Sequence, residues 1–220
     1  MDKYQIVYAD PPWDYKNKAS RGAAAKHYDT TKYQTLADIP VKDIAAPNAV
    51  LIMWYTGNFN KEAMDLAKAW GFTVKTMKGF TWVKLNELVK KHIEKAMRDR
   101  FISGGGFDFD FFMDLLNDQI RMNGGNYTRA NTEDCLIAIR GKGLQRLDAS
   151  IKQVVIDALG KHSAKPEEVR RRIERLYGNV KRLEMFARES APGWDVWGNQ
   201  APNPIDLVAA AANDNQPNEE

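Results

Sequence analysis

Strand-like runs alternate with helical patterns along most of this 220-residue chain, and this alternation narrows the choice of fold. Two stretches, 60–70 and 166–178, have apolar residues at helical spacing and end at the stop signals Gly71 and Gly178. The strand-like runs between these helices are continuous and apolar, which is typical of strands buried on both faces. We therefore predict an α/β fold around a mostly parallel sheet with helices on both faces. The predicted strands are residues 4–9, 49–56, 74–83, 133–140, 153–158 and 180–187.

The stretch between residues 85 and 123 breaks this alternation. Apolar residues recur at helical spacing on both sides of a Gly-rich break at 103–106, and basic residues surround the first stripe. We predict a helical insertion at 85–123 within a single domain that spans residues 1–202. Residues 203–220, which are rich in Asn, Asp and Pro around an alanine run, are expected to form a polar tail that is disordered near its end.

Composition excludes several classes of protein. No apolar run approaches the roughly 20 residues that a membrane helix needs, and the N-terminus lacks a signal-peptide pattern. The single cysteine, Cys135, leaves no internal disulfide, and no His or Cys cluster has zinc-ligand spacing, so we expect no metal. These features predict a protein of the reducing cytoplasm. The net charge of +3 permits nucleic-acid binding, and basic residues concentrate at 161–182.

The tetrapeptide Asp10-Pro11-Pro12-Trp13 follows the first predicted strand directly. Ligands of α/β sheets bind beyond the carboxyl ends of strands, where this tetrapeptide is expected to lie. The Asp10 carboxylate and the Pro11 carbonyl can both accept hydrogens from an aromatic amino group, because proline leaves that carbonyl outside a strand ladder. Trp13 offers a flat face on which a flipped base can stack. A strand-ending turn with a buried tryptophan explains the same residues without any function, so both interpretations stay open at this point.

Five blocks of the chain, taken in order, resemble one known family. They are Asp10-Pro11-Pro12-Trp13; Tyr28 with Thr30-Thr31; Leu51-Ile52-Met53-Trp54; the run from Tyr127 to Lys142; and the run from His162 to Gln200. The series is similar to the DPPW-type adenine methyltransferases, which include eukaryotic messenger-RNA adenosine methyltransferases and many bacterial and phage enzymes. The resemblance covers most of residues 4–201, and five blocks in order are far more specific than any single motif.

The resemblance implies a Rossmann-like fold with a permuted motif order and S-adenosylmethionine as cofactor. It implies methyl transfer to the exocyclic amino group (N-6) of adenine, by base flipping and direct in-line attack without a covalent intermediate. We favour DNA because residues 184–200 match the bacterial and phage pattern best, which would place the protein in a bacterial or phage-infected cell. The alternatives are an RNA adenine methyltransferase, a cytosine N-4 DNA methyltransferase, and a catalytically inactive nucleic-acid-binding subunit. Because Asp10 and Trp13 are both present, we favour an active enzyme.

The same resemblance implies roles for the matching residues. Asp10 and Pro11 would orient the target amino group, Pro12 belongs to the same catalytic turn, and Trp13 would pack the base. Tyr28 and Trp54 would line the base pocket, although both could equally be core aromatics. The implied cofactor-binding residues are Asp10, Lys165, Arg188, Glu189, Asn199 and Gln200, with Lys165 approaching the methionine carboxylate. The structural alternatives are a solvated lysine before a helix, a strand-end salt bridge at Arg188 and a turn at Asn199-Gln200.

The chain departs from the family pattern in three places. It begins just before Asp10, where longer members carry an upstream cofactor-binding segment. Glu189-Ser190 follows Arg188 where the messenger-RNA enzymes carry a His-Asn pair, so Glu189 is the expected partner of the ribose hydroxyls. The insertion at 85–123 has no clear counterpart and is our candidate for substrate contact or dimerisation. We expect a monomer or homodimer that binds nucleic acid and no membrane.

Overall fold

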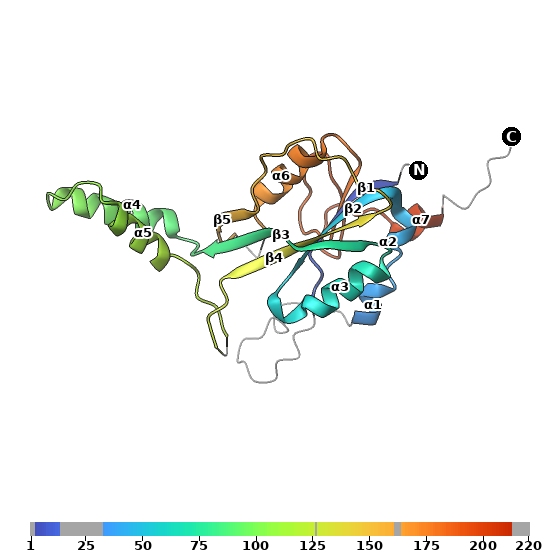
Figure 1. The fold of residues 1–220 in the computed structure, drawn as a ribbon, viewed down its shortest axis with the longest axis horizontal. Helices are drawn as coiled ribbons and strands as arrows, with labels where there is room; N and C mark the ends of the chain where they lie inside the picture. Colours follow the sequence, from blue (N-terminus) through green and yellow to red (C-terminus); the bar gives the residue numbers. More distant parts are fainter. Residues whose placement is uncertain (1–2, 14–32, 126, 161–163, 213–220) are drawn as a thin grey trace. The chain divides into compact units, whose positions relative to one another are not determined.

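The computed structural model describes residues 3–13, 33–125, 127–160 and 164–212, and in these its strands form a seven-stranded sheet (Figure 1). The strand order is β5-β3-β4-β2-β1-β6-β7. The strands are β1 (Tyr4–Ala9), β2 (Ala45–Tyr55), β3 (Thr73–Leu85), β4 (Thr132–Arg140), β5 (Val154–Ala158), β6 (Arg182–Met185) and β7 (Asp195–Trp197). The helices are α1 (Tyr33–Ala37), α2 (Val41–Ile44), the 3-10 turn η2 (Gly57–Phe59), α3 (Asn60–Ala69), α4 (Val89–Ile102), α5 (Phe109–Asp118), α6 (Glu167–Tyr177) and α7 (Leu207–Ala212). None of these helices has both the length and the apolar character that crossing a membrane requires.

The chain divides into two compact units whose boundary cuts through β3, β4 and α6. Strands β1, β2, β6 and β7 lie wholly in the first unit, and β5, α4 and α5 lie wholly in the second. The first unit is built from Met1–Gly79, Asp134–Ile151 and Glu174–Glu220, and the second from Phe80–Glu133 and Lys152–Ile173.

Strand β1 occupies the middle of the sheet in the first unit. It pairs in parallel with β2 on one side and with β6 on the other, so that Val7 lies beside both Leu51 and Leu183. Both edges of β1 are therefore hydrogen-bonded, and its residues Ile6 and Val7 are completely buried. The predicted strand at 4–9 is confirmed, because an uninterrupted apolar run suits a strand that is covered on both faces.

The sheet is mixed, which refines the expectation of a mostly parallel sheet. Strand β6 runs parallel to β7, but β4 runs antiparallel to β2, with Trp54 opposite Cys135. An apolar strand buried on both faces has the same composition whichever way it runs. Periodicity therefore located β4 without revealing its direction. Cys135 is buried and forms no disulfide, as its apolar surroundings predicted.

Helices α1 and α3 pack together over one face of the sheet in the first unit (Figure 1). The apolar face of α3 is buried against Leu51 and Met53 of β2 within one core cluster. Trp70, directly after α3, is fully buried, and its indole Nε1–H donates to the Leu36 carbonyl at 2.9 Å. The predicted helix at 60–70 is confirmed, and Gly71 follows it with φ +84°, a conformation that favours glycine.

The packed part of the first unit continues past residue 202, where we placed the end of the domain. The Ile205 N–H donates to the Val196 carbonyl at 2.9 Å, and Leu207 is buried in the core cluster. Helix α7 also packs against α2. The alanine run that we assigned to a tail therefore begins as a docked helix, because Leu207 supplies it with an apolar anchor.

The second unit holds the second half of β3, strand β5 and a helical hairpin. Strand β3 pairs in parallel with β5, with Trp82 beside Val155. Helix α4 follows β3, and α5 returns antiparallel to it (Figure 1). His92 Nδ1 lies 2.9 Å from Gln119 Oε1 at one end, and the Arg100 guanidinium lies 4.6 Å from the centre of the Phe111 ring at the other. Two helices thus form in the segment where we predicted them.

Candidate functional site

Four parallel strands of the first unit end at one edge of the sheet. Ala9 at the end of β1 lies beside Met53 of β2 and Met185 of β6, and Met185 lies beside Trp197 of β7. Because β1 has β2 on one side and β6 on the other, this edge is a switch point of the topology, where α/β proteins bind ligands. The segments that follow these strands are 10–13, 56–59, 186–189 and 198–200. They contain Asp10, Arg188, Glu189, Asn199 and Gln200, all of which we predicted to be site residues.

The tetrapeptide forms a tight turn at this edge. Asp10 is half-buried, and its N–H lies 3.5 Å from the Met185 carbonyl. The Trp13 N–H donates to the Pro11 carbonyl at 2.9 Å, so this carbonyl already accepts one hydrogen bond. The turn folds the chain back onto the Pro11 carbonyl, whose partner is thus a residue of the turn and not of a strand ladder. A carbonyl oxygen has two lone pairs, and one of them remains for a ligand.

Trp13 belongs to the core of the first unit. Only 6% of its surface is exposed, and its ring stacks on Phe59 with centroids 5.6 Å apart and planes inclined by 18°. Its indole Nε1–H donates to the carbonyl of Trp54 at 3.1 Å. One ring face is thus already covered by Phe59, which differs from the open stacking platform that we expected. These contacts fix the end of the turn that begins at Asp10.

Trp54 also lies in the core, where only 1% of its surface is exposed. Its indole Nε1–H donates to the Tyr8 hydroxyl at 2.6 Å. A fully packed indole cannot line an open pocket, so the structure supports the core alternative for Trp54. Burial raises the pKa of Tyr8 well above its usual value, and nearby Cys135, Glu184 and Asp10 reinforce the increase. The Tyr8 hydroxyl is therefore neutral at physiological pH.

A chain of two hydrogen bonds thus connects Tyr8, through Trp54, to Trp13 in the tetrapeptide. Tyr8 was missed by sequence reasoning, because a tyrosine inside an apolar strand looks like any other core aromatic. The only available signal was its position two residues before Asp10, on the strand that carries the site.

We expect Tyr8→Phe to destabilise the protein by about 1–3 kcal/mol, because the buried Trp54 N–H loses its acceptor. Urea unfolding followed by tryptophan fluorescence measures this change. Tyr33→Phe is the matched control, since Tyr33 is 38% exposed. Equal stability of the two variants would show that the Tyr8 hydroxyl does not hold the two indoles.

The segments after β6 and β7 approach each other closely at the same edge. Phe186 has φ 61°, a strained conformation for a non-glycine residue, and the Ala187 N–H donates to the Trp197 carbonyl at 3.0 Å. A side chain at Gly198 would place its Cβ 2.5 Å from the Ala187 carbonyl oxygen, so only glycine fits there. This contact positions the residues that follow each strand: half-buried Arg188 and exposed Glu189, Asn199 and Gln200.

Lys165 lies in the second unit, just before α6, and belongs to a cluster of three charges. Its Nζ is 3.0 Å from Glu133 Oε2, and the other carboxylate oxygen of Glu133 accepts from Lys84. The three side chains are only 14%, 16% and 11% exposed. Lys84 also lies 5.1 Å from the centre of the Trp82 ring. The three side chains together carry two positive charges and one negative charge.

Glu133 experiences two opposing effects on its pKa. Burial raises the pKa, but Lys165 and Lys84 lower it by more, so the carboxylate stays ionised well below neutral pH. Sequence reasoning identified Lys165 and missed Glu133 and Lys84, because the three residues lie far apart in the chain. For Glu133 and for Lys84, the one weak signal was that a charged residue stands near the end of an otherwise apolar strand.

Some predicted residues fall outside the part of the chain that the structure describes. Tyr28, Thr30 and Thr31 lie within residues 14–32, and His162 and Ser163 lie within 161–163. Within the described ranges, no group of three or more His, Cys, Asp or Glu side chains could hold a metal ion.

Comparison with known proteins identifies the family. A family model described as MT-A70 matches residues 4–101 and 114–200, which include the tetrapeptide, the three-charge cluster and the segments after β6 and β7. The chain belongs to the MT-A70 family. Methyltransferases of the MT-A70 family use S-adenosylmethionine. Between residues 4 and 200 the match leaves out only 102–113, so most of the segment that we predicted to be an insertion has a counterpart in the family.

Three relatives illustrate the range of this MT-A70 protein's similarities. The Type II methyltransferase M.MunI of Mycoplasma sp. is 28% identical over 220 residues, covering 91% of this chain and 79% of the relative. A probable N(6)-adenosine-methyltransferase MT-A70-like protein of Oryza sativa is 25% identical over 214 residues, covering 94% of this chain and 24% of the relative. The human N(6)-adenosine-methyltransferase catalytic subunit METTL3 is 26% identical over 209 residues, covering 91% of this chain and 28% of the relative. The chain therefore spans about a quarter of the length of the rice and human relatives.

Proposed function

We propose that this MT-A70 protein transfers a methyl group from S-adenosylmethionine to the exocyclic N-6 amino group of adenine in DNA. The observation that carries the proposal is the Asp10–Trp13 turn at the switch point of the sheet, beside the segments that hold Arg188 and Asn199-Gln200. Similarity to a type II methyltransferase over 79% of its length, and the bacterial and phage pattern of residues 184–200, support DNA over RNA.

In this proposal, Asp10 and Pro11 hold the target amino group. That nitrogen is a weak nucleophile, because its lone pair is delocalised into the ring. A hydrogen bond from the amino group to the Asp10 carboxylate, and one to the remaining lone pair of the Pro11 carbonyl, favour the pyramidal geometry that frees the lone pair. The nitrogen would attack the sulfonium methyl group of the bound cofactor directly. As the N–C bond forms, the S–CH3 bond would break and its electron pair would return to sulfur, and the methylated amino group would then lose a proton to water. Trp13 acts by fixing the turn, as its contacts with Phe59 and Trp54 suggest.

The chemistry of the side chains fits S-adenosylmethionine, which supplies an electrophilic methyl group when bound. The Glu189 carboxylate suits ribose hydroxyls, and the amides of Asn199 and Gln200 suit an adenine edge. Gly198 leaves no Cβ in the space beside Ala187, so the two backbone segments that carry these residues stay together. Lys165, in a cluster with a net positive charge, suits the methionine carboxylate.

We expect Lys165→Ala to weaken cofactor binding about 10- to 100-fold, which corresponds to the loss of one charge-assisted hydrogen bond of ~1.5–3 kcal/mol. Titration calorimetry with S-adenosylmethionine measures the effect, and Glu133 keeps Lys84 as a partner in this variant. Arg171→Ala, which removes an exposed basic residue of α6, is the control. Unchanged affinity of the Lys165 variant would remove this lysine from the proposed site.

The nature of the product tests the proposed function. The protein is incubated with unmethylated DNA and labelled S-adenosylmethionine, and the DNA is digested to nucleosides. We expect the label in N-6-methyl-2′-deoxyadenosine, whereas label in N-4-methyl-2′-deoxycytidine would identify the cytosine alternative. Absence of label in DNA together with cofactor binding would contradict DNA methylation and leave the RNA and inactive-subunit alternatives.

RNA remains a second candidate substrate, because the rice and human relatives are named as N(6)-adenosine-methyltransferases. A parallel reaction with RNA of the same sequence distinguishes the two. A higher kcat/KM on RNA than on single- and double-stranded DNA would favour the RNA alternative.

A further inference from the structure

Helix α4 presents a stripe of basic side chains. Lys91, Lys95 and Arg98 are spaced four and three residues apart, so they share one face of the helix, and all three are exposed. Within the described residues, none of the three makes a salt bridge, although Lys90 beside them pairs with Glu94. Three exposed cations that make no salt bridge with the described residues therefore lie along one face of α4.

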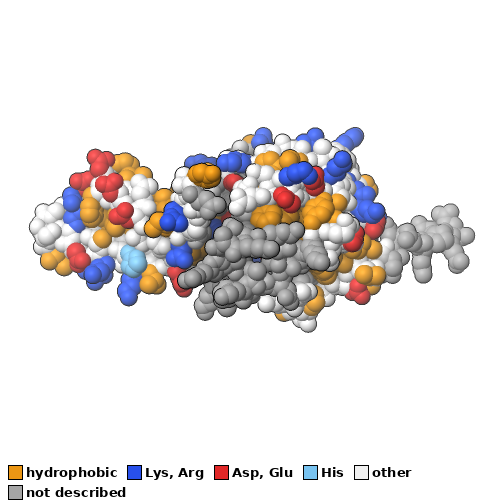
Figure 2. Space-filling view, turned by 90° about the horizontal axis from the view of Figure 1, so that it is seen from below, with side chains coloured by type: hydrophobic (Ala, Val, Ile, Leu, Met, Phe, Trp, Pro, Cys, Tyr) orange, Lys and Arg blue, Asp and Glu red, His pale blue; other side chains and the backbone are white. Residues whose placement is uncertain are grey.

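Helix α5 presents the opposite charge. Asp110, Asp114 and Asp118 recur every four residues, are exposed, and make no salt bridge within the described part of the chain. Like charges at this spacing repel one another and oppose helix formation. Figure 2 shows red side chains mainly at one margin of the hairpin and blue ones mainly at the other. Helix α4 carries five basic and two acidic residues, whereas α5 carries three acidic and no basic residues.

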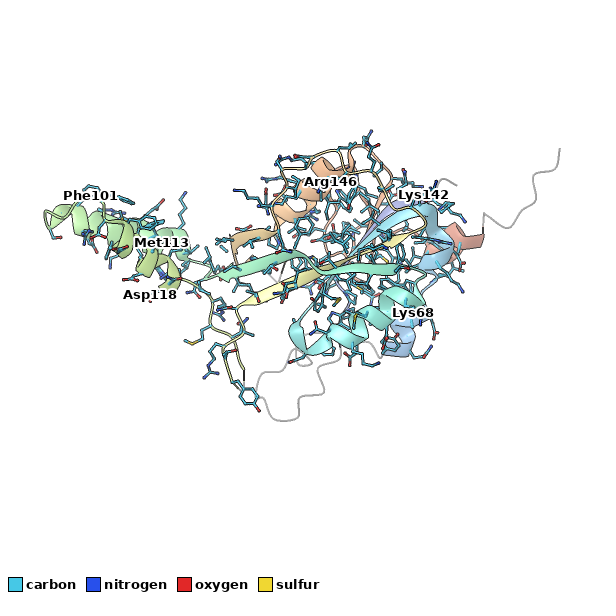
Figure 3. The ribbon with its side chains drawn as sticks, viewed as in Figure 1. Lys68, Phe101, Met113, Asp118, Lys142 and Arg146 are labelled. Carbon is cyan, nitrogen blue, oxygen red and sulfur yellow. The ribbon has the colours of Figure 1, made fainter. Side chains whose placement is uncertain are left out.

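The tip of the hairpin is apolar and exposed. Phe101, Ile102, Phe107 and Phe109 are 59%, 78%, 66% and 64% exposed, within nine residues of chain. Figure 3 places Phe101 on α4 and Met113 and Asp118 on α5. No residue of either helix is fully buried. A cluster of large exposed apolar side chains usually marks an interaction surface. Residues 102–113 are the part of the hairpin that the family model does not match.

We propose that the α4–α5 hairpin is a dimerisation surface whose occupant is a second copy of this chain. In a twofold dimer the same patch serves both protomers, so α4 of one protomer faces α5 of its partner and the reverse contact forms simultaneously. At 1.5 Å rise per residue, the basic stripe is about 10.5 Å long and the acidic stripe about 12 Å, so the charges match in length. The apolar tips then cover each other.

A nucleic acid is the competing occupant of the basic stripe. It would bind Lys91, Lys95 and Arg98 through its phosphates. It would also meet the three aspartates of α5 beside them, and it would leave the acidic stripe unpaired. A second copy satisfies both stripes at once, so the observations favour the dimer.

The test uses the full chain and two charge-reversed variants. One variant carries Lys91→Glu, Lys95→Glu and Arg98→Glu, and the other carries Asp110→Lys, Asp114→Lys and Asp118→Lys. We expect the wild type to sediment with twice the chain mass of 25.0 kDa, and each variant alone to sediment as a monomer. An equimolar mixture of the two should restore the dimer, because each reversed stripe then meets its complement.

Two controls keep the result interpretable. Reversal of Lys68, Lys142 and Arg146, exposed basic residues of the first unit labelled in Figure 3, should leave the dimer intact. Phe107→Ser with Phe109→Ser should weaken the dimer at least tenfold, while the circular dichroism spectrum of the variant shows that each chain keeps its fold. A wild type that stays monomeric up to ~100 μM overturns the proposal, as does failure of the mixture to restore the dimer. Loss of DNA binding in the α4 variant of a monomeric protein would assign the basic stripe to nucleic acid instead.

Discussion

Replacing Asp10 by alanine should lower the rate of methyl transfer by about 10³-fold and leave the fold intact. Asp10 is a half-buried residue at the end of a strand whose neighbours on both sides are hydrogen-bonded to it. Its loss removes the one carboxylate that we propose to grip the amino group. The Pro11 carbonyl, which already accepts the Trp13 N–H, cannot replace it.

Single-turnover methylation with saturating cofactor measures this effect on the chemical step. The Asp10→Asn variant keeps one acceptor oxygen and should retain more activity than Asp10→Ala. Asp38→Ala is the surface control, because Asp38 is exposed and its carboxylate accepts a hydrogen bond from the Gln34 side chain four residues earlier. A normal rate for Asp10→Ala would refute the proposed role, provided that thermal unfolding and calorimetry show a folded protein that still binds much of its cofactor.

Replacing Glu133 by glutamine should destabilise the protein by about 3–5 kcal/mol at neutral pH, because two largely buried lysines lose the carboxylate between them. Lys84 and Lys165 are 11% and 14% exposed, so solvent cannot take over this role. For a chain of this length, the expected decrease in Tm is roughly 10 °C. Glu94→Gln, which breaks the exposed pair with Lys90, should change stability little.

The difference between wild type and Glu133→Gln should depend on pH in a defined direction. The pKa of Glu133 is lower in the folded protein than in the unfolded chain, so its stabilising effect is complete above about pH 5. The effect is lost as the pH falls through the folded pKa. Chemical unfolding at a series of pH values measures it. A stability difference that is constant down to pH 3, or absent at pH 7, would contradict the ion-pair explanation.

Several features of the site could be predicted because they depend on neighbouring residues. An apolar run followed by Asp10 and two prolines identifies both a strand and its end. The helix at 60–70 and the strand at 4–9 follow from side-chain periodicity in the same way. The packing of α7 could not be predicted in this way, because an alanine run by itself does not indicate a buried face. Only the contact of Leu207 with the core shows where the helix lies.

The linear sequence by itself determined the family, the strand that carries the tetrapeptide, and the residues that follow β6 and β7. Each of these features depends on a short stretch of consecutive residues. Only the tertiary structure decided what those residues touch. The Tyr8–Trp54 hydrogen bond joins residues 46 positions apart, and the Lys84–Glu133 ion pair joins residues 49 apart. Such contacts arise when the sheet brings distant strands together, so no local pattern of polarity or propensity contains them. The direction of β4 and the burial of Trp13 have the same origin.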